Sequence, residues 1–237
     1  MGRPLRQCVG GLIYHVLNRA NAGLQLFDHA GDYEAFERVV SEAHRRTPMR
    51  VLSYCLMPNH WHLVLWPRDD GDLSRFLHWT TLTHTQRWHA HRGSVGGGHV
   101  YQGRFKSFVL EENEPFLVVC RYVERNALSA GLVVSAEEWR WCSLWRRRHE
   151  NAEGGMPLAD WPVPRPPGWV NWVNLAQTQK ELEILRDCIR RGRPFGSDAW
   201  LQSMARRFDL QMTSRPRGRP RKKVSGTFSA PNGEKGS

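Results

Sequence analysis

Short apolar runs alternate with longer stretches of helical spacing along the first part of this chain. Runs rich in β-branched and aromatic residues predict strands, and apolar residues recurring every three or four positions predict helices. The predicted strands are Leu12–Asn18, Val51–Leu56, the run that begins at His60, and Arg104–Leu110. The predicted helices are Tyr33–Arg46 capped by Asp32, Leu73–His91 capped by Asp72, Glu114–Ala130 ending at Gly131, and the shorter Trp139–Arg148.

The order of these elements is typical of an α+β fold. We expect a central antiparallel sheet with helices on one face, which leaves the other face for a ligand or partner. The connection Met57-Pro58-Asn59 is short enough for an antiparallel hairpin. The strand that begins at His60 is expected to lie centrally in the sheet.

The pattern changes after residue 150. Pro157–Pro167 is proline-rich and reads as a linker, and helices are predicted at Gln179–Arg191 and near Asp198–Phe208. From Ser214 the chain is poor in apolar residues, which predicts disorder. We therefore expect a main domain over 1–150, a helical extension over 151–210 and a disordered basic tail over 211–237.

Charge narrows the classes of partner. The 237 residues carry a formal net charge of +11 and the sequence pI is about 10.0. This balance favours nucleic acid as partner, with an anionic membrane second. No apolar run is long enough to span a bilayer. The 5 cysteines are scattered without a Cys-x-x-Cys pair, so the sequence supports neither a disulfide framework nor a zinc knuckle and fits a reducing cytoplasm.

Two histidines flank Trp61 at the start of a β-prone run. Alternate side chains of a strand point to opposite faces, so His60 and His62 are expected on one face, about 7 Å apart along the strand. Such a pair can bind one divalent metal if a third ligand comes from elsewhere. The alternative is a pair of hydrogen-bonded structural histidines. A histidine-triad hydrolase would need a third histidine where Val64 stands.

Tyr122 and Asn126 lie four residues apart on the helix predicted over Glu114–Ala130. They are neighbours at the edge of its apolar stripe, where a phenol and an amide oxygen could meet a metal held by the histidines. A phenol beside a polarised phosphate can attack a phosphodiester. The alternatives are a half-buried tyrosine with its hydroxyl in water and a polar residue near a helix C-terminus.

Several blocks together resemble one family, the REP-associated tyrosine transposases, a branch of the IS200-like HUH single-tyrosine transposases. The blocks are Met57-Pro58-Asn59 before His60-Trp61-His62, Gly103-Arg104-Phe105-Lys106-Ser107, Tyr122-x-x-x-Asn126 with Ala130-Gly131-Leu132, and Gly192-Arg193-Pro194-Phe195-Gly196. The resemblance covers about Gly10 to Trp200. Members often carry proline after the asparagine, where this chain has Ala127.

The resemblance implies a ferredoxin-like or RRM-like fold and a set of roles. His60, His62 and Asn126 would be metal ligands for Mg²⁺ or Mn²⁺, and Tyr122 the nucleophile. The substrate would be single-stranded DNA folded into imperfect palindromic hairpins, cut through a phosphotyrosine. Relatives include monomers and homodimers. Magnesium prefers oxygen ligands, so manganese should bind at least as well.

Basic residues supply candidate DNA contacts. Arg104 and Lys106 alternate with Phe105, so both are expected on one strand face as phosphate ligands, or as a solvated face. In the tail, Arg217, Arg219 and Arg221 with their glycine and proline neighbours resemble an AT-hook, a segment that lies in a narrow minor groove.

The sequence is therefore compatible with three functions. The first is a metal-dependent single-strand DNA endonuclease and strand transferase, and the second a hairpin-DNA-binding protein with little or no cleavage. The third is an RNA-processing enzyme. His84, His89 and His91 on the long helix are interpreted as structural or surface residues, because their spacing does not suit one shared metal.

Overall fold

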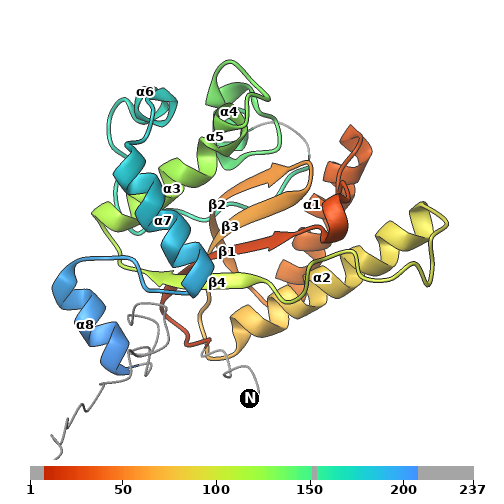
Figure 1. Cartoon of the computed structure of the whole chain (residues 1–237), viewed down its shortest axis with the longest axis horizontal. Helices are drawn as coiled ribbons and strands as arrows, with labels where there is room; N and C mark the ends of the chain where they lie inside the picture. The colour runs from red at the N-terminus through yellow and green to blue at the C-terminus, as the bar shows by residue number, and fades with distance from the viewer. Residues whose placement is uncertain (1–7, 151–153, 208–237) are drawn as a thin grey trace, which may run out of the picture.

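The computed structural model describes residues 8–150 and 154–207. A four-stranded antiparallel sheet with the order β2-β3-β1-β4 lies at its centre (Figure 1). The strands are β1 Ile13–Arg19, β2 Arg50–Met57, β3 His60–Trp66 and β4 Lys106–Leu110. β2 and β3 form the predicted hairpin, and β3 pairs with both β1 and β2. The central place predicted for the His60 strand, and the α+β class, are confirmed.

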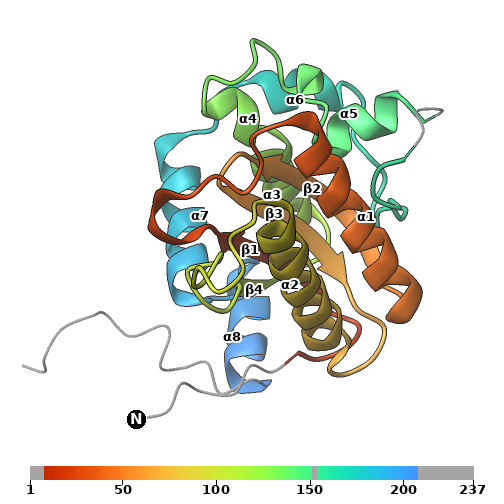
Figure 2. The same cartoon turned by 90° about the vertical axis from the view of Figure 1, so that its right-hand side faces the viewer.

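Helices α1 (Ala30–Arg46) and α2 (Asp72–His91) lie side by side on one face of the sheet (Figure 2). Phe36 and Phe76 have no exposed surface and join the strand side chains of this face in one core. Asp32 does not stand before α1 as predicted, because the helix already begins at Ala30. Its carboxylate accepts from the backbone N–H groups of Asp28 and His29, at 2.9 and 3.2 Å, and so caps the helix from inside its first turn.

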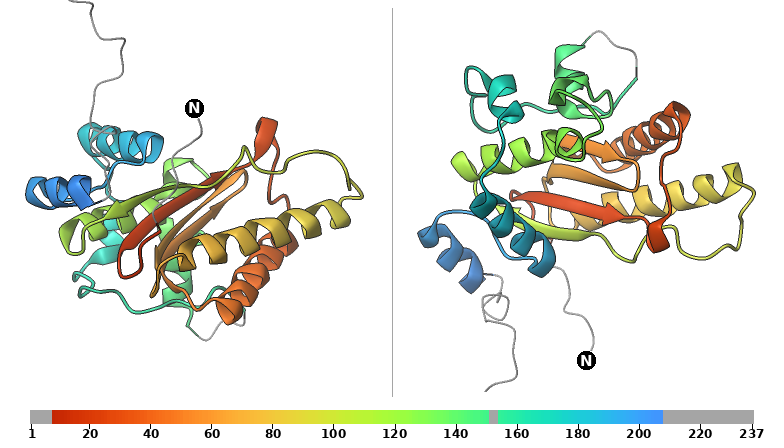
Figure 3. Two further views of the ribbon diagram at one scale, coloured as in Figure 1. Left: turned by 90° about the horizontal axis from the view of Figure 1, so that it is seen from below. Right: turned by 45° about the horizontal axis from the view of Figure 1, so that its top comes forward.

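The opposite face is covered as well, which corrects the expectation of helices on one face only (Figure 3). Its helices include α3 (Glu114–Glu124), α5 (Ser143–Arg148), α6 (Trp169–Asn174) and α7 (Gln179–Arg191). The cause is the apolar stripe of α3, which has to be buried. The stripe is buried as predicted, and consists of Phe116, Val119, Cys120, Val123 and Ala127.

Two further expectations need correction. The helix predicted over Glu114–Ala130 is two helices, α3 and α4 (Asn126–Ser129), separated by Arg125. The ψ angle of Arg125 is −8°, far from the helical value of about −42°, and turns the chain off the axis of α3. The segment Pro157–Pro167 is no free linker, because the N–H of Ala159 donates to Val51 O of β2 at 2.9 Å.

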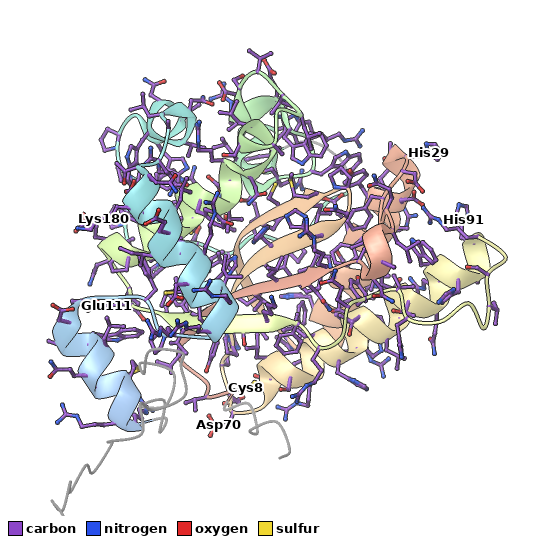
Figure 4. All side chains as sticks on the ribbon, in the orientation of Figure 1. Cys8, His29, Asp70, His91, Glu111 and Lys180 are labelled. Atoms are coloured by element: carbon purple, nitrogen blue, oxygen red, sulfur yellow. The ribbon has the colours of Figure 1, made fainter. Side chains whose placement is uncertain are left out.

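The remaining elements lie at the margins. A 3₁₀ turn, Ala136–Glu138, precedes α5, and the helix predicted over Trp139–Arg148 begins only at Ser143, because Cys142 before it has an extended backbone. Helix α8 (Asp198–Arg207) starts where Ser197 donates from its N–H and hydroxyl to Glu111 (Figure 4). Within the described parts of the chain, no helix has the length and apolar character needed to cross a membrane. The disorder predicted from Ser214 onward falls outside the described residues.

The three histidines of α2 that the sequence analysis singled out have the structural and surface places predicted. His84 is buried and its Nδ1 lies 2.7 Å from the hydroxyl of Tyr101. His89 contacts Ser94 through its Nδ1 at 2.9 Å. His91 lies at the outer end of α2, away from β3 (Figure 4).

The buried carboxyl of Glu37 on α1 should make the stability of the protein depend on pH. This carboxyl accepts a hydrogen bond from the hydroxyl of Tyr54 at 3.2 Å, and burial raises its pKa from 4.5 to about 7. The folded state thus keeps a proton that the unfolded chain releases, and stability falls as pH rises from about 4.5 to about 7. Glu37→Gln is expected to raise the free energy of unfolding at pH 8 by up to about 3 kcal/mol and to change it little at pH 4.5, measured by urea denaturation.

The matched control is Glu34→Gln on the same helix, where the side chain is 42% exposed. At pH 8 it should raise the free energy of unfolding far less than Glu37→Gln does, because burial costs this exposed side chain little. An equal effect of Glu37→Gln on the free energy of unfolding at the two pH values would contradict the raised pKa of the Glu37 carboxyl.

Candidate active site

Four side chains from three elements converge at one margin of the sheet. The ring centroids of His60 and His62 on β3 are 5.0 Å apart, and those of His62 and Tyr122 on α3 are 5.7 Å apart. Nδ2 of Asn126 on α4 lies 3.3 Å from Nε2 of His62. The same carboxamide is also a hydrogen-bonding neighbour of His60 and Tyr122. The structure therefore brings together all four residues that the sequence singled out here.

The alternation of β3 holds the two imidazoles on one face. Trp61 between them is wholly buried on the opposite face, where its Nε1–H donates to the hydroxyl of Tyr101 at 3.1 Å. Nδ1 of His60 lies 2.7 Å from Oδ1 of Asn59. A slip of one residue in the register would exchange Trp61 with the histidines, so the buried indole fixes which side chains face Tyr122.

Glu124 anchors α3 from within the core. Its carboxyl has no exposure and accepts from the Ser143 hydroxyl at 2.6 Å and from Nε1–H of Trp169 at 2.7 Å. The Ser53 hydroxyl of β2 lies 3.4 Å away. Burial raises the pKa of the Glu124 carboxyl, while the bonds from Ser143 and Trp169 oppose that shift. These bonds join α3 to β2, α5 and α6 at a point two residues from both Tyr122 and Asn126.

Two arginines, Arg121 of α3 and Arg125 directly after this helix, connect it to α6 and the residues that follow. Arg121 is 4% exposed and donates to the carbonyls of Trp172, Leu175 and Ala176 at 2.8 to 3.2 Å. Arg125 donates to Val173 O at 2.9 Å. The carbonyls at the C-terminal end of α6 and just beyond it thus accept hydrogen bonds from guanidinium groups.

Burial sets the protonation of the site. It lowers the pKa of His60 from 6.5 to about 4, and nearby Arg19 lowers it further. Burial likewise lowers the pKa of His62 well below its ordinary value, helped by His15 and His60. Both imidazoles are therefore neutral near neutral pH. Burial raises the pKa of the Tyr122 phenol, and Arg186 of α7 and Asn126 oppose that shift.

This donor set fits a divalent metal only if the amide takes part. Among the residues that the structure describes, no group of three His, Cys, Asp or Glu side chains could hold a metal ion. Two neutral imidazoles offer ring nitrogens, and an amide offers an oxygen. His60, Tyr122 and Asn126 are partly exposed whereas His62 is buried, so a ligand can reach the site from the margin.

Three residues near the site were missed from the sequence. His15 on β1 is buried, and its Nε2 lies 2.9 Å from Nδ1 of His62. Arg19 stands directly opposite His60 in the β1–β3 pairing. Arg186 lies 64 positions after Tyr122 in the numbering, and no local pattern links the two. Strand alternation puts His15 and Arg19 on one face of β1, but only the register aligns them with β3.

The predicted DNA contacts divide into two groups. Lys106 is opposite Leu17 in β4–β1, and Leu17 is opposite His62 in β1–β3. Lys106 therefore shares the face of His62, two strands and about 10 Å away. Arg104 is exposed just before β4, and Phe105 is buried in the core of the other face. Arg217, Arg219 and Arg221 lie outside the described residues.

Comparisons with known proteins give a family and a fold. The family model described as IS200-like transposase matches residues 8–126, which is half of the chain. A solved structure described as a REP-associated tyrosine transposase bound to a REP hairpin is similar, with a TM-score of 0.54 and 16% identity over 68% of this chain and 100% of that one.

A crystal structure of a putative transposase from Deinococcus radiodurans gives a TM-score of 0.37 at 14% identity, over 52% of this chain and 95% of that one. No curated protein matches the sequence.

The hydrogen bonds from Arg121 to the end of α6 should protect the backbone amides of this segment from hydrogen exchange, and removing them should reduce that protection. Arg121→Met keeps the apolar stem but removes the donors to three carbonyls, which is expected to cost on the order of 2 kcal/mol. Amide hydrogen exchange over residues 169–176 should become faster while that of β3 stays slow, measured by mass spectrometry. Lys180→Met on the exposed side of α7 is the control (Figure 4). Unchanged exchange in Arg121→Met would show that α6 is held by other contacts.

Proposed function

This chain belongs to the IS200-like transposase family, and on that premise we propose that it is a metal-dependent single-strand DNA endonuclease and strand transferase. It cuts beside hairpins and holds the cut strand through a 5′-phosphotyrosine on Tyr122. The observation that carries this proposal is the convergence of Tyr122, His60 and His62 on the carboxamide of Asn126. A purely structural arrangement would not need a phenol and two neutral imidazoles gathered around one carboxamide at a partly exposed margin.

The reaction exchanges one phosphate ester for another. The phenolic oxygen of Tyr122 forms a bond to the phosphorus atom of the scissile linkage, and the bond between phosphorus and the 3′ oxygen breaks. The phenolic proton is lost and the leaving 3′ oxygen gains one, so a free 3′ hydroxyl results. In the reverse sense a 3′ hydroxyl attacks the phosphotyrosine and restores the phenol. Each step replaces one phosphate ester bond by another, so the number of these bonds is unchanged and rejoining the strand needs no high-energy cofactor.

The chain's own residues prepare these steps. Because burial raises the pKa of Tyr122, the phenol is protonated near neutral pH and has to lose its proton as it attacks. Asn126 holds the hydroxyl against the imidazoles. His60, His62 and Asn126 would hold the Mg²⁺ or Mn²⁺, which supplies polarisation of the phosphate.

The DNA follows from charge and from the related fold. Arg19 and Lys106 lie on the face of the histidines and can bind phosphates on either side of the cut. Arg104 extends this basic margin, and the tail arginines Arg217, Arg219 and Arg221 would add a minor-groove anchor. The similar solved structure is bound to a REP hairpin, which supports REP-like palindromes as the substrate class. The protein would act as a monomer or homodimer at the nucleoid in the cytoplasm.

The decisive test is a covalent adduct. Wild-type protein with a hairpin-bearing single strand and Mn²⁺ is expected to give a protein–DNA species that survives denaturing electrophoresis. Tyr122→Phe should lose this adduct completely while it still binds the same DNA in a mobility-shift assay, because only the phenolic oxygen is removed. Tyr33→Phe, a buried tyrosine of α1 on the other face, is the control and keeps the adduct.

The competing function makes a different prediction in the same assay. A hairpin-DNA-binding protein with little cleavage would bind and shift the strand but give no adduct with Mg²⁺ or Mn²⁺. Adduct formation on RNA but not DNA would favour an RNA-processing enzyme. Either result would overturn the proposed transferase.

Metal binding can be tested without DNA. His62→Ala and Asn126→Ala are each expected to weaken Mn²⁺ binding by at least about tenfold, a size typical even of residues that only support a metal ligand. The readout is the electron paramagnetic resonance signal of free Mn²⁺ during titration. His78→Ala, an exposed histidine of α2, should bind as the wild type does. Equal affinities in all four proteins would place the metal elsewhere or nowhere.

A further inference from the structure

His15 is a buried polar side chain in direct contact with a candidate metal ligand. On β1, Leu17 stands opposite His62, so His15 lies diagonally across from His62 on the same sheet face. Its Nε2 is 2.9 Å from Nδ1 of His62, and the two ring centroids are 5.1 Å apart. Phe108 of β4 packs against the His15 ring with centroids 4.9 Å apart. His15 therefore has little freedom to turn away.

The bond between the two rings contains a single proton. Either His62 donates from Nδ1 to a bare Nε2 of His15, or His15 donates from Nε2 to a bare Nδ1 of His62. The first arrangement leaves Nε2 of His62 bare, pointing at Nδ2 of Asn126 at 3.3 Å. An amide N–H donates to a bare nitrogen, so this contact agrees with the first arrangement.

His60 follows the same scheme on its own strand. Its Nδ1 lies 2.7 Å from Oδ1 of Asn59. A carboxamide oxygen only accepts, so the proton of His60 sits on Nδ1 and its Nε2 is bare. Both histidines thus have Nδ1 tied to an acceptor, with Asn126 as the common neighbour of the two rings.

We propose that His15 is a positioning residue of the active site, which accepts the Nδ1 proton of His62 and so holds its Nε2 bare and aimed at Asn126. This inference rests on the proposed function in that a bare Nε2 is the form that ligates metal. It adds a residue that the sequence motifs did not include, 47 positions away from His62.

A direct role for His15 in the chemistry fits the geometry less well. The side chain is 1% exposed, so DNA does not reach it. Its Nε2 is already engaged by His62, and its ring centroid is 6.4 Å from that of Tyr122 in an edge-on contact. His15 acts through His62 and touches no substrate.

The tautomer of His62 is the primary measurement. Long-range ¹H–¹⁵N correlation spectra of the ¹⁵N-labelled full chain, without metal or DNA, report which ring nitrogen of His62 carries the proton. The expected wild-type result is a proton on Nδ1 and a bare Nε2. A wild-type His62 protonated on Nε2 would overturn the proposal without any variant.

Two substitutions separate the hydrogen bond from packing. His15→Phe keeps a ring against Phe108 but has no acceptor, whereas His15→Gln can accept through its amide oxygen. In His15→Phe the His62 proton should redistribute toward Nε2, and Mn²⁺ affinity should fall by about tenfold or more. His15→Gln should restore the Nδ1 form and bring the affinity back to within about threefold of the wild type.

Cleavage kinetics give a third readout, since kcat should fall in His15→Phe while KM for the DNA stays the same. Equal losses of Mn²⁺ affinity and kcat in the folded His15→Phe and His15→Gln variants, or no loss in either variant, would overturn the proposal. Because the spectra need neither metal nor DNA, a wild type that shows the Nδ1 form but binds no Mn²⁺ and forms no adduct would refute the proposed function alone. If His15→Phe does not fold, the His62 tautomer in the spectra of the wild type and of His15→Gln still tests the proposal.

Discussion

A carboxyl group with no contact with water fixes the helix that carries Tyr122. Glu124 is tolerated in the core because Ser143 and Trp169 both donate to it, and an unpaired buried carboxyl would cost several kcal/mol. Those donors come from α5 and α6, more than a dozen residues further along the chain. Segments beyond the family's matched region, residues 8–126, thus supply the bonds that hold the buried carboxyl of the helix bearing the phenol. We infer that those segments are a structural condition of the site.

Covering both faces of the sheet shapes how a substrate reaches the site. With α1 and α2 on one side and α3, α6 and α7 on the other, access is left at the margin where β3 begins. His60, Tyr122 and Asn126 are partly exposed there, while His62 lies behind them. A phosphate arriving at this margin would meet the phenol and the amide first, with the basic side chain of Arg19 opposite His60.

Burial and hydrogen bonding act on these groups in different ways. Burial lowers the pKa of His60 and His62 and raises that of Tyr122, so all three rings are uncharged near neutral pH. The hydrogen bonds then decide where the remaining protons sit, through Asn59 for one imidazole and His15 for the other. A site of neutral donors inside a basic protein is suited to attract an anionic strand and to bind a cation beside it.

Local patterns in the sequence determined much of the fold. Period-two alternation put His60 and His62 on one face, and helical spacing gave the buried stripe of α3 and the bounds of α7 at Gln179–Arg191. The nearly continuous apolar runs of β2 and β3 also contained a signal that both faces are buried.

Only the tertiary structure decided which distant groups meet. The contact of His15 with His62 depends on strand register, and the bonds of Glu124 with Ser143 and Trp169 depend on how separate segments pack. Periodicity describes which face of an element a residue occupies, but it contains no information about the element that faces it. The residues of the site were therefore visible in the sequence, whereas the contacts that orient them were not.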